Sequence, residues 1–198
     1  MKDFEKLYKE LKIFQEGMYG FEIKNNIFEI EDEQSGMKYK VNLKSESICT
    51  TKIEGSCRFN YLKKLQKCAD AVIITKNSNN YELHILELKK SIHGDDLKEL
   101  YEKFLGAYLR AMSIIVAYCK ITKISFYLLY EKNRNNKSKE KNNTNFEGTS
   151  EKKDNKYYFD LFSKDKVKNN FQLKISPFDT ETLEIIIKCT KNSKILEI

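Results

Sequence analysis

The sequence predicts a single α/β (α+β) domain in which a central mixed β-sheet is flanked by helices. Three observations lead to this prediction: two apolar β-type runs on either side of a polar loop, a long amphipathic helix after them, and a further apolar run after the helix. With 198 residues and 40% hydrophobic content, the chain can form one domain with its own core. The strand–helix–strand step predicts a right-handed crossover within a mixed sheet.

The N-terminal part, residues 1–45, is expected to form a helix followed by strands. Apolar residues recur at helical spacing over residues 3–15, with Asp3 as a fair N-cap and Gly17 as a fair stop. Short strands are expected near residues 19–24, 27–31 and 37–43, with residues 32–36 as the last turn. Residues 44–57 are polar and ambiguous, and residues 59–65 are interpreted as a short helix.

The central hairpin is the most informative feature of the chain. Its strands are expected at residues 68–76 and 81–89, and the loop between them, residues 77–80, is rich in turn-forming Asn and Ser. If these four residues are the turn, Lys76 faces Tyr81, and the same register brings Asp70 opposite Glu87. The two-residue period of a strand also puts Lys89 on the same face as Glu87.

After the hairpin the sequence predicts a helix and further strands. Asp95 is a good N-cap for a helix from residue 96 to about 118, and its apolar stripe is interpreted as core packing against the sheet. A strand is expected at residues 123–131. Residues 132–156 are interpreted as an exposed, mobile polar loop, and the C-terminal part, residues 157–198, as strands near 157–162, 171–175 and 183–189.

Two opposed carboxylates at the open end of the hairpin are tolerated when one of them is protonated, when a cation neutralises both, or when the side chains point away from each other. At a Cβ separation of about 5 Å and an effective dielectric constant near 20, they repel by roughly 3 kcal/mol. Mg²⁺ is often held by one or two carboxylates, with water and substrate phosphate completing its shell. Such an ion activates water and stabilises charge on phosphorus, and Lys89 could orient the water or the scissile phosphate. We therefore take Asp70 and Glu87 as candidate metal ligands and Asp70, Glu87 and Lys89 as candidate catalytic residues.

The Glu-x-Lys triplet alone is not specific, because it recurs elsewhere in a chain with 33% charged residues. It also occurs at Glu10–Lys12, Glu22–Lys24 and Glu151–Lys153. The copy at Glu87–Lys89 differs in ending an apolar strand, in having an acid in register on the partner strand, and in preceding a long helix. The alternative is that these residues are ordinary surface charges of an unrelated α/β interaction domain.

At Asp70, Glu87 and Lys89 the chain resembles the PD-(D/E)xK phosphodiesterase superfamily, over about residues 46–131. The resemblance implies a restriction-endonuclease-like core in which the two acids bind Mg²⁺, for which Mn²⁺ substitutes. It also implies that the Leu88 carbonyl assists the metal and that Lys89 assists the attacking water. The expected activity is Mg²⁺-dependent endonuclease cleavage of DNA, with RNA as a further candidate substrate, in restriction or phage defence. Cutting both strands usually needs two sites, so a homodimer is expected.

The chain also departs from the family pattern. Ala69 precedes the first acid where many members have proline. The upstream glutamate found in many members could be Glu54 or Glu46, and the auxiliary residue on the following helix could be Lys98 or Lys103. Two further functions are alternatives to a restriction or defence endonuclease. The first is a catalytically inactive nuclease-fold protein with a nucleic-acid-binding or regulatory role. The second is a nuclease of DNA repair or junction resolution.

Composition sets further bounds. The net charge of +7 and pI of about 8.9 favour polyanionic partners, although residues 132–156 alone supply +4 of this charge. The cysteines are odd in number and form no Cys-x-x-Cys pair, which speaks against a zinc site or a secreted disulfide scaffold. His84 and His93, the only histidines, are weak general-base candidates. No signal-peptide or membrane-spanning run is visible, so we expect a cytoplasmic protein without a membrane partner.

Overall fold

The described part of the chain has an α+β fold with two β-sheets and one long helix. A computed structural model describes residues 5–10, 20–53, 67–78, 80–92, 96–133, 166–168, 183–189 and 195–198. The larger sheet contains, in spatial order, β1 (Glu22–Lys24), β4 (Ser47–Thr50), β5 (Ala71–Asn77), β6 (Asn80–Ile92), β7 (Ile121–Asn133), β9 (Leu183–Cys189) and β8 (Lys166–Lys168). The smaller sheet contains β10 (Ile195–Glu197), β3 (Met37–Asn42) and β2 (Ile27–Asp32), and the helix is α2 (Asp96–Ile115).

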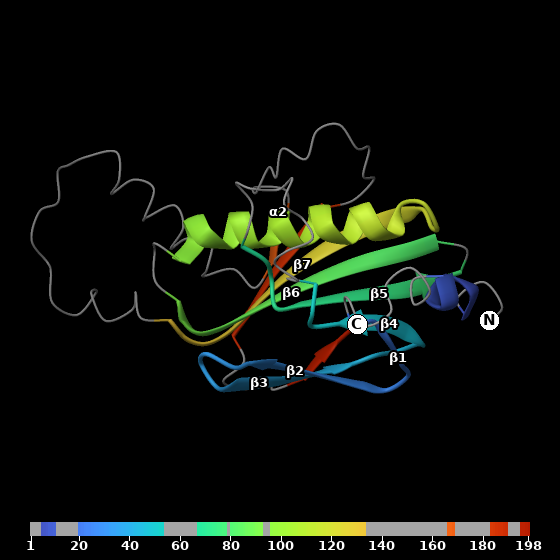
Figure 1. The fold of residues 1–198 in the computed structure, drawn as a ribbon. Coiled ribbons are helices and arrows are strands. Elements are labelled where there is room, and N and C mark those ends of the chain that lie inside the picture. Colours follow the sequence, from blue (N-terminus) through green and yellow to red (C-terminus); the bar gives the residue numbers. More distant parts are fainter. Residues whose placement is uncertain are drawn as a thin grey trace, which may run out of the picture.

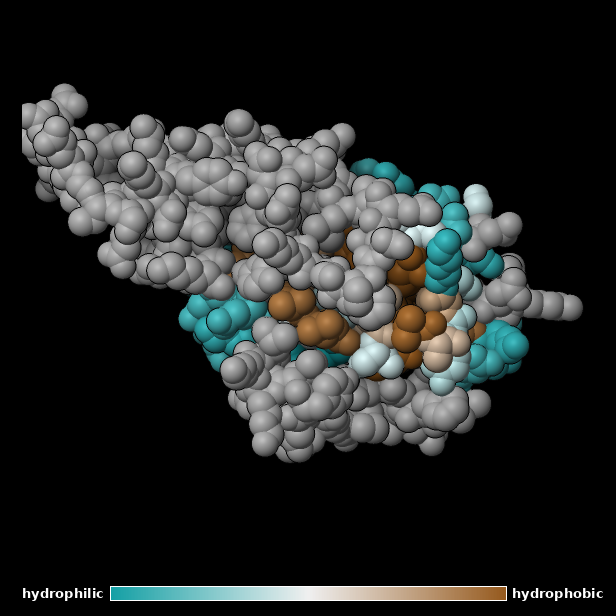
Figure 2. All heavy atoms as spheres, turned by 90° about the horizontal axis from the view of Figure 1, so that it is seen from above, coloured by the Kyte–Doolittle hydropathy of each residue, from teal (hydrophilic) through white to brown (hydrophobic). Residues whose placement is uncertain are grey.

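These elements form three layers, with the seven-stranded sheet in the middle (Figure 1). Helix α2 covers one face of this sheet and the three-stranded sheet covers the other. Seen from the helix side, apolar residues occupy the middle of the visible described surface and hydrophilic residues lie on either side of them (Figure 2). The middle sheet therefore has two buried faces, and each strand at its centre contributes to two cores.

The two cores follow the two-residue period of the strands. On β5, Val72 and Ile74 belong to the core beneath α2, whereas Ala71 and Ile73 face the three-stranded sheet. Because both faces are covered, the central strands contain runs of consecutive buried residues, such as Ala71–Thr75 of β5, instead of a strict alternation of buried and exposed positions. Helix α2 contributes the buried stripe that its sequence predicted, which includes Leu100, Phe104, Tyr108 and the additional small residues Ala107 and Ala111.

The hairpin register predicted from the sequence is confirmed. Lys76 pairs with Tyr81, and the ladder continues without a shift to Ala71 and Leu86. The expected four-residue turn was too long, because the ladder runs on to Asn77 and Asn80 and leaves only two residues between the strands. Ser78 has a φ of 55°, the left-handed conformation that two-residue hairpin loops require.

The strand–helix–strand step is confirmed as well. After α2 the chain returns in β7, which pairs in parallel with β6, whereas β5 pairs with β6 in antiparallel orientation. The larger sheet is therefore mixed. The strand expected at residues 123–131 is longer at both ends, so residues 132 and 133 belong to β7 and not to the loop predicted from residue 132. The strand expected at residues 183–189 is β9, which extends the sheet parallel to β7.

The N-terminal predictions agree with the structure where it describes them. Residues 5–10 are helical and Leu7 is buried, and β1, β2 and β3 match the expected strands to within a few residues. Three strands were not predicted: β4 in the ambiguous polar segment, and the three-residue strands β8 and β10. The caps Asp3 and Asp95, His93, the helix at 59–65, residues 134–156 and the strands at 157–162 and 171–175 lie outside the described residues. Among the described helices, none combines the length and apolarity needed to cross a membrane.

Candidate active site

The three candidate residues lie at the open end of the β5–β6 hairpin. Asp70 directly precedes β5, and the established register, extended by one residue, brings it opposite Glu87. Strand β6 continues beyond this point and pairs with β7 as far as Ile92, so its other edge is not covered by β5 there. The strand period puts Asp70, Glu87 and Lys89 on one face, and this is the face that α2 covers.

Asp70 is fixed by the main chain of β6. Its Oδ2 accepts a hydrogen bond of 2.6 Å from the amide of Leu88. Burial raises the pKa of Asp70, whereas the Leu88 amide and the charge of Lys103 lower it, and so does a side-chain hydrogen bond with Glu87. The two carboxyl groups are electrostatically coupled, because the charge of Asp70 in turn raises the pKa of Glu87.

Glu87 has no exposed side-chain surface. Its Oε1 lies 2.6 Å from Nζ of Lys103 and 3.9 Å from Nζ of Lys89. Its Oε2 is buried without a hydrogen-bond donor. Burial, reinforced by the charge of Asp70, raises the pKa of Glu87 to about 8, while Lys103 and Lys89 act in the opposite direction. The carboxyl pair therefore requires either a proton or a cation to be stable at neutral pH.

The two lysines reach the acids from different elements. Lys89 extends from β6 and Lys103 from α2, and their side chains are 22% and 21% exposed. Of the two auxiliary lysines that the sequence left open, Lys103 contacts the site, while the side chain of Lys98 lies outside the described residues. The upstream glutamate is not identified: Glu46 lies just before β4 and does not line the pocket, and Glu54 is outside the described residues.

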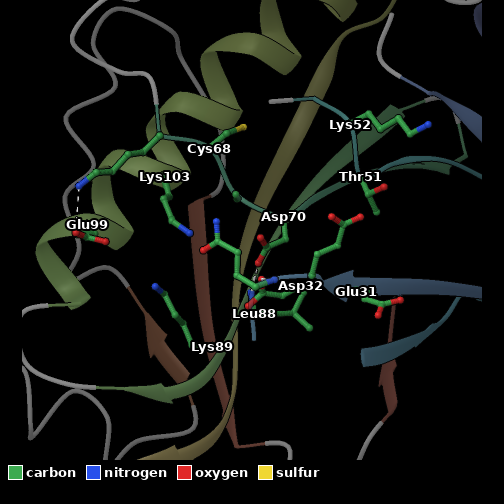
Figure 3. A pocket seen from close by; sticks show the side chains of 14 residues that line it. Glu31, Asp32, Thr51, Lys52, Cys68, Asp70, Leu88, Lys89, Glu99 and Lys103 are labelled. Carbon is green, nitrogen blue, oxygen red and sulfur yellow. Dashed lines mark hydrogen bonds and ion pairs between the residues drawn. The ribbon is translucent and has the colours of Figure 1, made fainter. Parts of the chain in front are cut away.

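A pocket of about 640 Å³ opens beside this cluster (Figure 3). Lys89 and Lys103 lie on one side of Asp70, and Asp32, at the end of β2, lies on the other. The residues that line it are Glu31, Asp32, Glu33, Gln34, Thr51, Lys52, Lys67, Cys68, Ala69, Asp70, Leu88, Lys89, Glu99 and Lys103. The pocket is thus lined by both acids and lysines, and the acids at the β2–β3 turn were not among the candidates from the sequence.

Asp32 organises the β2–β3 turn, whose residues line the pocket. It accepts hydrogen bonds from the amide of Gln34, at 3.1 Å, and from the hydroxyl of Ser35. Lys90 donates a hydrogen bond of 3.4 Å to the Ser35 carbonyl, which connects the turn to β6. The charge of Asp32 contributes to raising the pKa of Asp70. The turn at residues 32–36 was visible in the sequence, but its approach to Asp70 depends on how the two sheets pack.

The residues present fit a Mg²⁺ ion. Asp70 and Glu87 offer the hard carboxylate oxygens that Mg²⁺ prefers, and the buried Oε2 of Glu87 lacks a donor. The Leu88 carbonyl points to the same strand edge as its amide, toward Asp70, because both main-chain groups of a strand residue face one neighbour. Within the described part of the chain, no three His, Cys, Asp or Glu side chains are grouped to hold a metal. The protein would therefore supply two carboxylates, and water and substrate the remaining ligands.

The histidine and cysteine side chains that the structure describes are buried in the protein interior. His84 lies on the opposite face of β6, where its Nε2 is 2.9 Å from Thr75 Oγ1 and its Nδ1 is 3.2 Å from Tyr127 Oη. Burial lowers the pKa of His84 to about 4, so the ring is neutral at physiological pH. The described cysteines Cys49, Cys68 and Cys119 are buried, as is common for cysteines that pack as small apolar residues.

Comparison with protein-family models, with curated proteins and with solved structures finds no match to this chain. The geometry of the site is therefore the basis for any inference about its chemistry.

Proposed function

We propose that the protein is a Mg²⁺-dependent endonuclease of PD-(D/E)xK type with a restriction-endonuclease-like core. The observation that supports this most strongly is the carboxyl pair of the buried Glu87 and the partly buried Asp70, in which Oε2 of Glu87 lacks a donor. Lys89 lies on the same face, and a pocket large enough for a nucleotide unit opens beside it. A divalent cation between the two carboxylates compensates their charges, and the neighbouring amine of Lys89 is suited to phosphodiester chemistry.

Each residue has a distinct role in this proposal. Asp70 and Glu87 hold the ion with help from the Leu88 carbonyl. The ion, when bound, lowers the pKa of a water nucleophile and offsets charge on the scissile phosphate. Lys89 positions that water and the phosphate. Lys103 favours the ionised form of Glu87 through its ion pair.

The proposed substrate is DNA, with cleavage leaving 5′-phosphate and 3′-hydroxyl ends. The net charge of +7 favours a polyanion, and the lysines that line the pocket can meet the phosphate backbone. Cleavage of both strands requires two sites, so we propose a homodimer acting in the cytoplasm in restriction or phage defence. RNA is a competing substrate that the same assay tests.

Cleavage assays on supercoiled plasmid, single-stranded DNA and RNA with Mg²⁺ test the proposal. We expect Asp70→Asn, Glu87→Gln and Lys89→Ala each to reduce the cleavage rate at least about 100-fold. Glu22→Gln and Lys24→Ala are matched controls, because this second Glu-x-Lys triplet is an exposed ion pair of 2.9 Å on β1. Equal activity in the wild type and the three site variants would reject the assigned site.

A second candidate function is a nuclease-fold protein that binds nucleic acid without cutting it. The 2.6 Å ion pair between Lys103 and Glu87 favours this candidate, because it already compensates one charge of the carboxyl pair. Electrophoretic mobility shift on linear and branched DNA would then show binding without cleavage. Preferential cutting of branched DNA would instead indicate repair or junction resolution.

A further inference from the structure

Asp70 lies outside the β5–β6 ladder, so the sheet alone does not fix it. The ladder ends at Ala71 and Leu86. Downstream, the position of Asp70 is set by the start of β5, and its carboxylate is held by the Leu88 amide. Upstream, the described chain resumes at residue 67, and Cys68 and Ala69 are buried in the core beneath α2. The contacts of residue 67, together with the burial of Cys68 and Ala69, therefore set how the chain enters the site.

Residue 67 is attached to α2 in two ways. Arg110 donates a hydrogen bond of 3.1 Å from its guanidinium to the Lys67 carbonyl. The Lys67 side chain forms ion pairs of 3.3 Å with Glu99 and 3.2 Å with Glu102. All three partners are residues of α2.

Burial distinguishes these two attachments. Arg110 is only 3% exposed, its hydrogen bond to the Lys67 carbonyl is partly buried, and hydrogen bonds from a charged donor are among the stronger ones in proteins. The side chains of Lys67, Glu99 and Glu102 are nearly half exposed, and ion pairs of that kind contribute little. Among the described contacts of Lys67, the hydrogen bond from Arg110 is therefore the stronger anchor of the chain before Asp70.

The same helix also reaches the second acid. Lys103, which contacts Glu87, lies about two helical turns before Arg110 and hence on the same side of α2. Helix α2 thus contacts both halves of the site. Lys103 contacts the side chain of Glu87, and Arg110 contacts the main chain that leads to Asp70.

We propose that Arg110 is a positioning residue. It holds the chain at Lys67 so that the Asp70 carboxylate accepts the hydrogen bond from the Leu88 amide and is placed to bind the metal together with Glu87. The consequence for metal binding rests on the proposed function. The consequence for the Asp70–Leu88 hydrogen bond does not, because that bond can be observed without metal or substrate.

Arg110→Met and Arg110→Lys test this inference, with Glu102→Gln as the control that removes only an exposed ion-pair partner. Hydrogen exchange of the Leu88 amide, followed by NMR, reports the Asp70 contact directly. In Arg110→Met we expect this amide to exchange about tenfold faster, while amides of the β5–β6 ladder such as Ile85 stay protected. We expect Mn²⁺ affinity, measured by calorimetry, to fall by about 10- to 100-fold, as for other residues that orient a metal ligand. Arg110→Lys, which retains a donor, should recover part of both effects.

Unchanged Leu88 exchange and Mn²⁺ affinity in a folded Arg110→Met would overturn the inference. So would a uniform increase in exchange over all of β6, since that indicates a general loss of stability. If Arg110→Met does not fold, the same readouts in Arg110→Lys decide. A wild type that protects the Leu88 amide but binds no Mn²⁺ and cuts no DNA would refute the proposed function and leave the positioning role to be decided by exchange alone.

Discussion

Nζ of Lys103 lies 2.6 Å from Oε1 of Glu87, a carboxyl group with no exposed surface. The ion pair links α2 to β6 at the site. Burial and the charge of Asp70 raise the pKa of Glu87 to about 8, and Lys103 opposes both. The charge state of Glu87 near neutral pH therefore depends on its neighbours, which gives the site a testable pH dependence.

Replacing Lys103 with Met should move the pH profile of cleavage. Without the ammonium group the pKa of Glu87 rises further, so a metal must displace a more tightly held proton. We expect the rising limb of the pH–rate profile to lie at higher pH, and the rate at pH 7 to fall about tenfold for each pH unit by which the limb moves. Lys123→Met, which removes the 3.6 Å ion pair of a lysine with Glu82, should leave the profile unchanged. A profile in Lys103→Met that overlays the wild type would contradict this role.

Glu87→Gln should flatten the dependence of stability on pH in metal-free protein. The folded-state pKa of Glu87, about 8, lies above the unfolded value of 4.5, so its contribution is fully present below pH 4.5 and is lost as pH rises to about 8. Across this window the wild type should lose on the order of 1.4 kcal/mol of unfolding free energy for each pH unit, and the variant should not. Urea denaturation at several pH values measures the difference, with the exposed Glu29→Gln as control. Parallel curves for wild type and Glu87→Gln would contradict the assignment.

Mg²⁺ should stabilise the folded protein if Asp70 and Glu87 share an ion. A ligand that binds only the native state adds about 2.7 kcal/mol when present at 100 times its dissociation constant, which corresponds to a rise in Tm of roughly 5–10 °C for a chain of this size. Asp70→Asn and Glu87→Gln should show no rise in calorimetric melting. NaCl at matched ionic strength controls for screening, and an equal rise with NaCl, or in both variants, would argue against a shared ion.

His84→Gln should alter acid stability without affecting cleavage. The folded pKa of His84, about 4, is below its unfolded value of 6.5, so its contribution is present above pH 6.5 and is lost as pH falls toward 4. The variant loses hydrogen bonds to Thr75 and Tyr127, so we expect it to be about 1–3 kcal/mol less stable at pH 7. Its stability should decline less steeply on acidification. A large loss of cleavage in folded His84→Gln would place the histidine in the mechanism.

The parts of the fold that the sequence predicted depend on local pattern. The hairpin register follows from one polar loop between two apolar runs. The predicted turn is two residues too long, but the register is still correct because each strand is longer by one residue, and the two added residues, Asn77 and Asn80, pair with each other. Strand β4 was missed because Ser47-Ile-Cys-Thr50 is short and buried on both faces, so it shows no alternation. Strand β10 was missed because a three-residue strand exists only through its pairing with β3.

The residues of the site were likewise predictable only where local pattern determines their position. Asp70, Glu87 and Lys89 were named from register and period, which are local properties. Lys103 could be named only as one of two helix lysines, because the choice depends on the rotation of α2 over the sheet. Asp32 and Arg110 were not named at all, since one depends on how the two sheets pack and the other on a main-chain contact across 43 residues.

The most direct test of the shared ion is an anomalous difference map from a crystal grown with MnCl₂. If the two acids share a cation, the map will show one manganese peak per chain within bonding distance of carboxylate oxygens of both Asp70 and Glu87, and no peak there in Glu87→Gln. A wild-type map in which Nζ of Lys103 still pairs with Glu87 and no manganese lies between the two acids would contradict the shared site.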